Sequence, residues 1–163
     1  MKEEYKQLIE EAKTNRAVNK KLTQKLKTMK DGPLDRLFHE TDESAFSCID
    51  CLQCANCCKT TGPLFTQKDI ERISKNLRMK PGEFIEQYLR IDEENDYVLQ
   101  STPCTFLGND NYCSIYEVRP KACAEYPHTD MRNQKKILNL TLKNAEICPA
   151  VATVLNEIKA KIS

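Results

Sequence analysis

The sequence predicts a mostly α-helical protein that also contains a small β-hairpin, an α+β fold class. Three observations support this prediction. Residues 2–30 contain no Gly or Pro, and their apolar side chains recur at steps of three and four residues, as one face of an α-helix requires. The same spacing of apolar residues follows Pro149. Residues 108–111, Gly-Asn-Asp-Asn, separate two short apolar runs, which is the pattern of a hairpin.

The composition predicts a soluble protein with reduced thiols. The 163 residues suit one domain, of which 40% are hydrophobic and 30% charged, and the mean hydropathy is −0.61. There is no run of about 18 apolar residues that would span a membrane, and the first residues lack the apolar core of a secretory signal. We therefore expect a cytoplasmic protein. Its nine cysteines, an odd number, read as ligands or redox groups and not as disulfides.

The first predicted helix covers residues 2–30 and ends at the Asp-Gly-Pro of residues 31–33. Asn15 and Asn19 interrupt its apolar stripe, which favours a helix lying on the body of the protein over a long coiled coil. It carries nine Lys or Arg against four Glu. Since Tyr5 is its one aromatic residue and it has no arginine cluster, a solvated helix face is favoured over nucleic-acid binding. The apolar stripe consists of Tyr5, Leu8, Ile9, Ala12, Leu22, Leu26 and Met29.

Shorter elements are predicted in the next part of the chain. A short helix covers residues 34–38, and a loop at residues 41–44 follows it. Thr66 begins a helix, with Asp69 three residues on as an acidic form of the capping box. Pro81 is the first residue of another helix.

The second half of the chain brings further cysteines together in this prediction. Residues 97–99 read as a strand, and residues 105–107 and 112–115 as a hairpin with Cys104 and Cys113 at its base. A helical turn within residues 117–126 presents Cys123, and residues 137–142 are read as a possible strand. The last helix is expected to pack against the first, with an inward stripe of Val151, Val154, Leu155, Ile158 and Ile162.

Five of the nine cysteines fall within residues 48–58, at every third position and then as a pair. A Cys-x-x-Cys step lets two thiolates converge on one ion across a tight turn, and core packing has no need of such a repeat. Zinc sites combine two such thiolates with two further ligands. Cubane iron–sulfur sites combine a Cys-x2-Cys-x2-Cys run with a remote Cys that is often followed by Pro, as Cys148 is here. Both an iron–sulfur cluster and zinc therefore stay open as the cofactor.

The motifs resemble those of a known family in their order. Residues 51–58 read CxxCxxCC, and Cys-Thr-Phe-Leu, Cys-Ser-Ile-Tyr, Arg-Pro-x-x-Cys-x-x-Tyr-Pro and Cys-Pro follow at residues 104, 113, 119 and 148. This pattern resembles the YkgJ-type cysteine-cluster family of zinc- or iron-chelating proteins, which also includes flagellin lysine N-methylase. The resemblance implies eight metal ligands: Cys51, Cys54, Cys57, Cys58, Cys104, Cys113, Cys123 and Cys148.

The resemblance covers roughly residues 46–150, so residues 1–33 are predicted to be an N-terminal helical extension of a metal-centred cysteine-cluster domain at residues 34–163. One feature departs from the family. Its members often carry Phe-x-Cys directly before the cluster, and here Phe46-Ser47-Cys48 lies one triplet too early. Cys48 is therefore an added ligand, a replacement for one of the eight, or a free thiol.

Three functions stay open. The first is a metal-cluster protein with a redox, storage or delivery role. The second, implied by the resemblance alone, is a protein lysine methyltransferase-like enzyme using S-adenosylmethionine, although no glycine-rich strand-turn-helix is present to hold that cofactor. The third is a structural zinc module that docks to an unidentified protein partner through its basic first helix.

No catalytic residue is identified. His128 is more readily a surface or capping residue than a ligand, and His39 still more so. Arg119 is expected to offset thiolate charge or to hold an anion. Tyr116 and Tyr126 are expected at the edges of the core.

Overall fold

The structure, a computed structural model, describes residues 1–163. The chain folds into two compact units. One, here called the helical unit, comprises Met1–Cys54 and Pro127–Ser163, and the other, the mixed unit, comprises Ala55–Tyr126. The predicted class, mostly α with a small β component, is confirmed. The predicted division after residue 33 falls inside the helical unit and stays a prediction.

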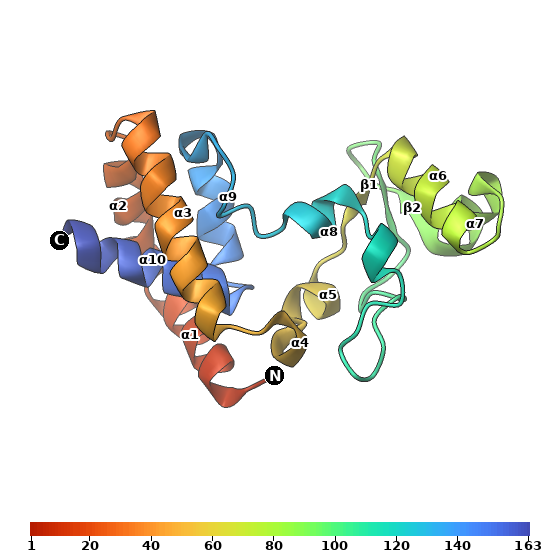
Figure 1. The fold of residues 1–163 in the computed structure, drawn as a ribbon, viewed down its shortest axis with the longest axis horizontal. Helices are drawn as coiled ribbons and strands as arrows, with labels where there is room; N and C mark the ends of the chain where they lie inside the picture. The colour runs from red at the N-terminus through yellow and green to blue at the C-terminus, as the bar shows by residue number, and fades with distance from the viewer. The chain divides into compact units, whose positions relative to one another are not determined.

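The helical unit is built around the last helix, α10 (Pro149–Ile162), which contacts α1 (Glu3–Thr14) and α3 (Asp31–Cys48) (Figure 1). The expected packing of the last helix on the first is therefore confirmed. The other helical segments of the unit are α2 (Arg16–Leu26), α4 (Cys51–Cys54), a short 3-10 turn at Gln134–Ile137, and α9 (Leu138–Asn144). The largest fully buried side chains of its core include Phe38, Leu26, Leu34, Leu138, Val151, Val154, Leu155 and Ile158.

Two predictions for the first part of this unit were wrong. The first helix is not continuous, because α1 ends at Thr14 and α2 begins at Arg16. The Asp-Gly-Pro of residues 31–33 begins α3 instead of serving only as a stop. Pro is tolerated there, since backbone N–H groups in the first turn of a helix have no intrahelical acceptor.

Two later segments of the unit are helical where a loop and a strand were expected. The predicted loop at residues 41–44 belongs to α3, where the Thr41 hydroxyl donates to the carbonyl of Leu37 at 2.8 Å. The predicted strand at residues 137–142 is mostly α9, which buries Leu138, Thr141 and Leu142 at helical spacing and exposes Leu140. A period of two would have buried Leu140 as well, so the packing selected the helix.

The mixed unit has a three-stranded antiparallel sheet in the order β1 (Leu64–Phe65), β3 (Tyr97–Leu99), β2 (Leu89–Ile91). Leu64 pairs with Val98, and Leu89 pairs with Leu99. Its helical segments are α5 (Asn56–Thr60), α6 (Gln67–Asn76), α7 (Pro81–Tyr88), the 3-10 turn η1 (Tyr116–Val118) and α8 (Lys121–Glu125). Its core gathers Phe65, Ile70, Ile73, Phe84, Leu89, Leu99, Phe106 and Ile115.

Local signals were read correctly in this unit, and the predicted hairpin forms in part. Thr66 and Asp69 form the predicted capping box, Pro81 is the first residue of α7, and residues 97–99 are a strand. Of the hairpin only one bridge forms, between Leu107 and Cys113. The N–H of Ser114 also donates to the carbonyl of Phe106 at 2.8 Å, and the turn is closed by the N–H of Gly108 donating to the carbonyl of Tyr112 at 2.8 Å.

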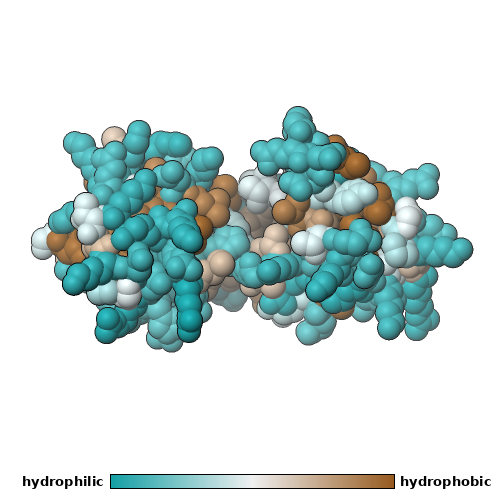
Figure 2. All heavy atoms as spheres, turned by 90° about the horizontal axis from the view of Figure 1, so that it is seen from above, coloured by the Kyte–Doolittle hydropathy of each residue, from teal (hydrophilic) through white to brown (hydrophobic).

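The surface is largely polar, as Figure 2 shows on one face of the molecule. The few large apolar side chains that stay exposed include Val18, Leu64, Ile91 and Tyr112. No helix combines the length and apolar character that crossing a bilayer would require.

Candidate metal centre

Four cysteines of the mixed unit form what we call the mixed-unit sulfur group: Cys58, Cys104, Cys113 and Cys123. Cys58 lies in α5 and Cys123 in α8. Cys104 lies in the loop that follows residue 103, and Cys113 pairs with Leu107 in an isolated β-bridge. The N–H of Cys104 donates to the carbonyl of Cys58 at 2.8 Å, so these two ligand-bearing segments are joined through the backbone.

The electrostatics show that these thiols are neighbours. Burial raises the pKa of Cys104, Cys113 and Cys123, and the negative charge of a Cys58 thiolate raises all three further. Cys123 is an exposed residue, but partial burial of its sulfur and the charges of Cys58, Cys104 and Cys113 raise its pKa to about 12. A cation placed among the four would reverse this effect, because it stabilises every thiolate at once.

Cys58 has the lowest thiol pKa of the group, about 7. The hydrogen bond from the Cys57 side chain lowers it most, burial works against this, and the charge of Lys59 lowers it further. Cys57 is therefore a fifth thiol beside the group.

Two other side chains support the group. Asp69, buried at the start of α6, accepts the N–H of Lys121 at 3.1 Å and so holds the start of α8, the helix that carries Cys123. The Arg119 guanidinium lies over the Tyr116 ring, 4.0 Å from its centroid, and its positive charge lowers the pKa of the thiols at residues 113 and 123. The expectation that Arg119 offsets thiolate charge agrees with this placement.

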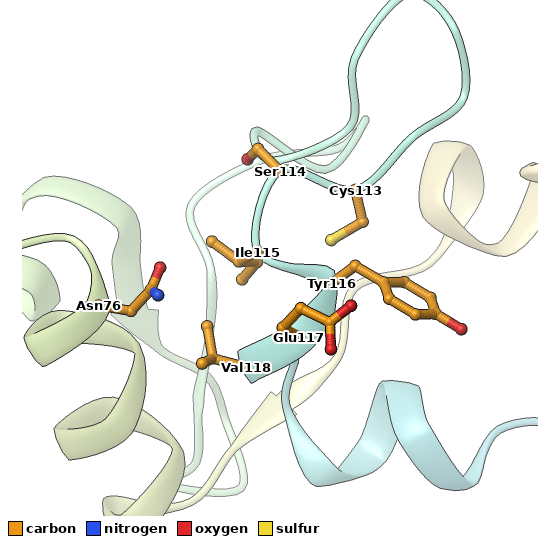
Figure 3. Close-up of a pocket in the computed structure, with 7 residues that line it drawn as sticks. All are labelled: Asn76, Cys113, Ser114, Ile115, Tyr116, Glu117 and Val118. Carbon is orange, nitrogen blue, oxygen red and sulfur yellow. The ribbon is translucent and has the colours of Figure 1, made fainter.

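A pocket of about 300 Å³ lies beside Cys113. Asn76 and residues 113–118 line it, and Figure 3 shows the Cys113 sulfur pointing toward the turn at Ile115 and Tyr116. Neither His39 nor His128 lines it, since both belong to the helical unit. The polar side chains of this lining are those of Asn76, Cys113, Ser114, Tyr116 and Glu117.

The helical unit holds a second set, here called the helical-unit sulfur group: Cys51, Cys54 and Cys148. Cys51 and Cys54 are the two ends of α4, and Cys148 directly precedes α10. Burial raises the pKa of Cys148 to about 12. Backbone N–H groups at the start of α10 lower it in part, and the charges of the thiolates at residues 51 and 54 raise it. These three thiols are therefore also neighbours.

The turn that carries Cys51 is held by its own hydrogen bonds. The N–H of Asp50 donates to the Tyr5 hydroxyl at 3.0 Å, and the Asp50 carboxylate accepts the N–H of Leu52 at 2.9 Å. The start of α1 is thereby tied to the residue just before the cluster. Sequence reasoning missed this contact, because nothing local to Tyr5 indicates a partner 45 residues away.

Cys48 is the last residue of α3 and is exposed, and the Ser47 hydroxyl lies 3.5 Å from its sulfur. None of the nine cysteines forms a disulfide.

The donor set fits a soft metal ion, since both groups offer sulfur without a carboxylate or an imidazole. As the side chains stand, no three His, Cys, Asp or Glu residues are arranged to hold an ion. The thiols would have to lose their protons and close on the metal, as is usual where binding and folding are coupled.

Fold and sulfur groups together define a class: a small, mostly helical, thiol-rich domain equipped to bind a soft metal. The CxxCxxCC family model, described as a "putative zinc- or iron-chelating domain", matches residues 50–149, and the chain belongs to this family. This confirms the resemblance to a cysteine-cluster family. No curated protein matches the chain, and no solved structure does.

Proposed function

We propose that the protein binds zinc or iron at two separate sulfur sites, one in each compact unit. The observation that carries this proposal is the partition of the thiols. In the mixed unit, the charges of Cys58, Cys104 and Cys113 raise the pKa of Cys123. In the helical unit, the charges of Cys51 and Cys54 raise the pKa of Cys148. Seven of the eight cysteines implied by the family motifs belong to these two sets.

The mixed-unit group is proposed to be a closed, structural site. Four thiolates occupy all four positions of a tetrahedrally coordinated ion and leave none for water or substrate, which is the arrangement of structural zinc. The four cysteines lie up to 65 residues apart in the sequence, so a bound ion would close the loops between them and stabilise the unit. Cys58, Cys104, Cys113 and Cys123 would hold the ion, and the metal would supply cross-linking and not chemistry.

The helical-unit group offers three cysteines. A three-thiolate site leaves a coordination position for another donor, which suits iron, a cluster or an exchangeable ion and therefore a redox or delivery role. Since both groups require reduced thiols, the proposal places the protein in a reducing compartment such as the cytoplasm.

Elemental analysis of protein purified without air tests the proposal. We expect zinc or iron in the parent chain. Cys123→Ser and Cys148→Ser should each remove one site's share of metal, and the double variant should remove both shares. Cys48→Ser is the matched control and should leave the metal content unchanged. Visible absorption would mark iron, and a colourless loaded protein would mark zinc.

Far-UV circular dichroism of each variant separates loss of metal from loss of fold. A folded parent chain that carries no metal, and takes up none from added zinc or iron salts, would overturn the proposal. A single substitution that strips all metal from a folded chain would contradict two independent sites.

A further inference from the structure

We propose that the thioether of Met1 is the fourth sulfur donor of the helical-unit group, beside Cys51, Cys54 and Cys148. The inference rests on the proposed metal-binding function. It concerns a residue outside residues 50–149, so the family match does not assign it.

The first observation is a distance. The sulfur of Met1 lies 3.7 Å from the sulfur of Cys54, which is buried. Zinc–sulfur bonds are about 2.3 Å long, so two sulfurs on one tetrahedral ion lie about 3.8 Å apart. The two sulfurs therefore already have the separation that a shared ion requires.

The second observation is that the residues directly after Met1 are held in place. The carbonyl of Lys2, the N-cap of α1, accepts the N–H groups of Tyr5 at 3.1 Å and Lys6 at 3.3 Å, so α1 starts two residues after Met1. Tyr5 is 2% exposed, and its hydroxyl accepts the N–H of Asp50. The Lys2 ammonium lies over the Tyr5 ring, 5.6 Å from its centroid. The start of α1 is thus fixed against the turn that opens into Cys51.

The third consideration is charge. Three thiolates on a divalent ion leave a net charge of −1, and a fourth thiolate would leave −2. A thioether is a soft, neutral donor and completes the coordination without adding negative charge. The ligand class that fits this set is a soft ion such as zinc or iron.

Selenium X-ray absorption tests the proposal directly, because it reports the neighbours of one sulfur position whatever the protein's activity. The chain is produced behind a removable leader so that residue 1 can be varied. Met29, Met79 and Met131 are changed to Leu, the protein is labelled with selenomethionine and loaded with zinc, and selenium remains only at residue 1. We expect a zinc neighbour of selenium at bonding distance.

The matched control keeps selenium only at Met131. Met1 and Met131 are 39% and 40% exposed and belong to the same unit, so exposure alone cannot produce a difference. No zinc neighbour is expected at residue 131, where the thioether instead lies 3.1 Å from Nδ1 of His128.

A chelator competition gives a second readout. Met1→Leu should weaken the binding of one of the bound zinc ions by about tenfold or more, and Met131→Leu should not. Circular dichroism confirms the fold of both variants.

A zinc-loaded protein whose selenium at residue 1 has only light-atom neighbours would overturn this inference. Met1 would then be a plain packing contact, and the proposed function would stand. A parent chain that binds no metal would overturn the proposed function and this inference together.

Discussion

The carboxylate of Asp69 accepts the N–H of Thr66 at 2.8 Å and the N–H of Lys121 at 3.1 Å, so one side chain caps the starts of two helices. Arg72 donates to the same carboxylate at 2.8 Å. Burial raises the pKa of Asp69, but these donors favour the ionised form and together hold the pKa below its usual range. The Asp69 carboxylate thus links the capping box of α6 to α8, the helix that carries Cys123.

Removing this carboxylate should weaken the mixed unit. Asp69→Ala deletes the cap and leaves the N–H of Lys121 without its acceptor, so we expect the free energy of unfolding to fall by about 2–3 kcal/mol. The zinc or iron affinity of the mixed-unit sulfur group should fall as well, because α8 loses its anchor. Urea unfolding and chelator competition measure the two effects. Glu71→Ala removes the same charge from an exposed position of α6 and should cost much less.

The contribution of Asp69 should depend on pH in a stated direction. A depressed folded-state pKa stabilises the protein above the unfolded value of 3.8, and this stabilisation is lost as the pH falls through the folded pKa. The parent and Asp69→Asn should therefore differ in unfolding free energy near neutral pH and converge in acid. A constant difference between pH 6 and pH 2 would show that the ionised carboxylate is not what stabilises the unit.

His39 should titrate above its ordinary pKa. The hydrogen bond to the Asp130 carboxylate raises the pKa most, and the charges of Asp130 and Glu43 raise it further. A raised pKa means that this pair stabilises the fold fully below pH 6.5 and ceases to do so as the pH rises through the folded pKa. Titration of the His39 ring by NMR measures the shift. Asp130→Asn should bring the midpoint down toward 6.5, and an unchanged midpoint would rule out the pairing.

The two compact units should respond separately to core mutations. Phe38 and Phe84 are each 0% exposed, one in the core of each unit. Truncation to Ala costs about 3–5 kcal/mol in a packed core. Phe38→Ala should lower protection from hydrogen exchange and metal retention in the helical unit, and Phe84→Ala should do so in the mixed unit. Equal losses across both units from either variant would show that they unfold as one.

Much of the fold could be predicted because its signals are local. A capping box at Thr66, a Pro at residue 81 and a Pro at residue 149 each begin a helix through interactions within a few residues. The segments that were mispredicted are those decided by distant packing. Residues 137–142 were read as a possible strand, but Leu138 packs in the core of the helical unit and Leu142 is buried on the same helix.

The candidate site divides in the same way. The spacing of residues 48–58 predicts metal binding with no structure at all, since few other functions need that repeat. The division of the cysteines between two sulfur groups could not be predicted from their spacing. Cys54 and Cys57 are three residues apart and belong to different compact units, and Cys58 neighbours a cysteine 65 residues away. The Asp69–Lys121 hydrogen bond spans 52 residues and has no sequence signature.

Cys48 is predicted to be a cysteine that the metal does not need. It ends α3 with an exposed side chain, and the thiolates that raise the pKa of Cys148 are those of residues 51 and 54. Cys48→Ser should therefore leave zinc or iron content unchanged. In the metal-loaded protein its thiol should be alkylated faster than the seven cysteines of the two sulfur groups, because metal-bound thiolates are shielded from the reagent.

Exposure alone cannot explain that difference, because Cys51 is exposed as well. The bound metal should cause the difference in alkylation rate. Cys51 should be alkylated slowly in the loaded protein and as fast as Cys48 once a chelator has removed the ion. Mass spectrometry of peptides alkylated before and after chelation follows both residues in one sample. If Cys48→Ser instead lost metal in proportion, or shifted the absorption spectrum of the bound ion, Cys48 would be a ligand. The CxxC register would then begin one triplet earlier than the family pattern.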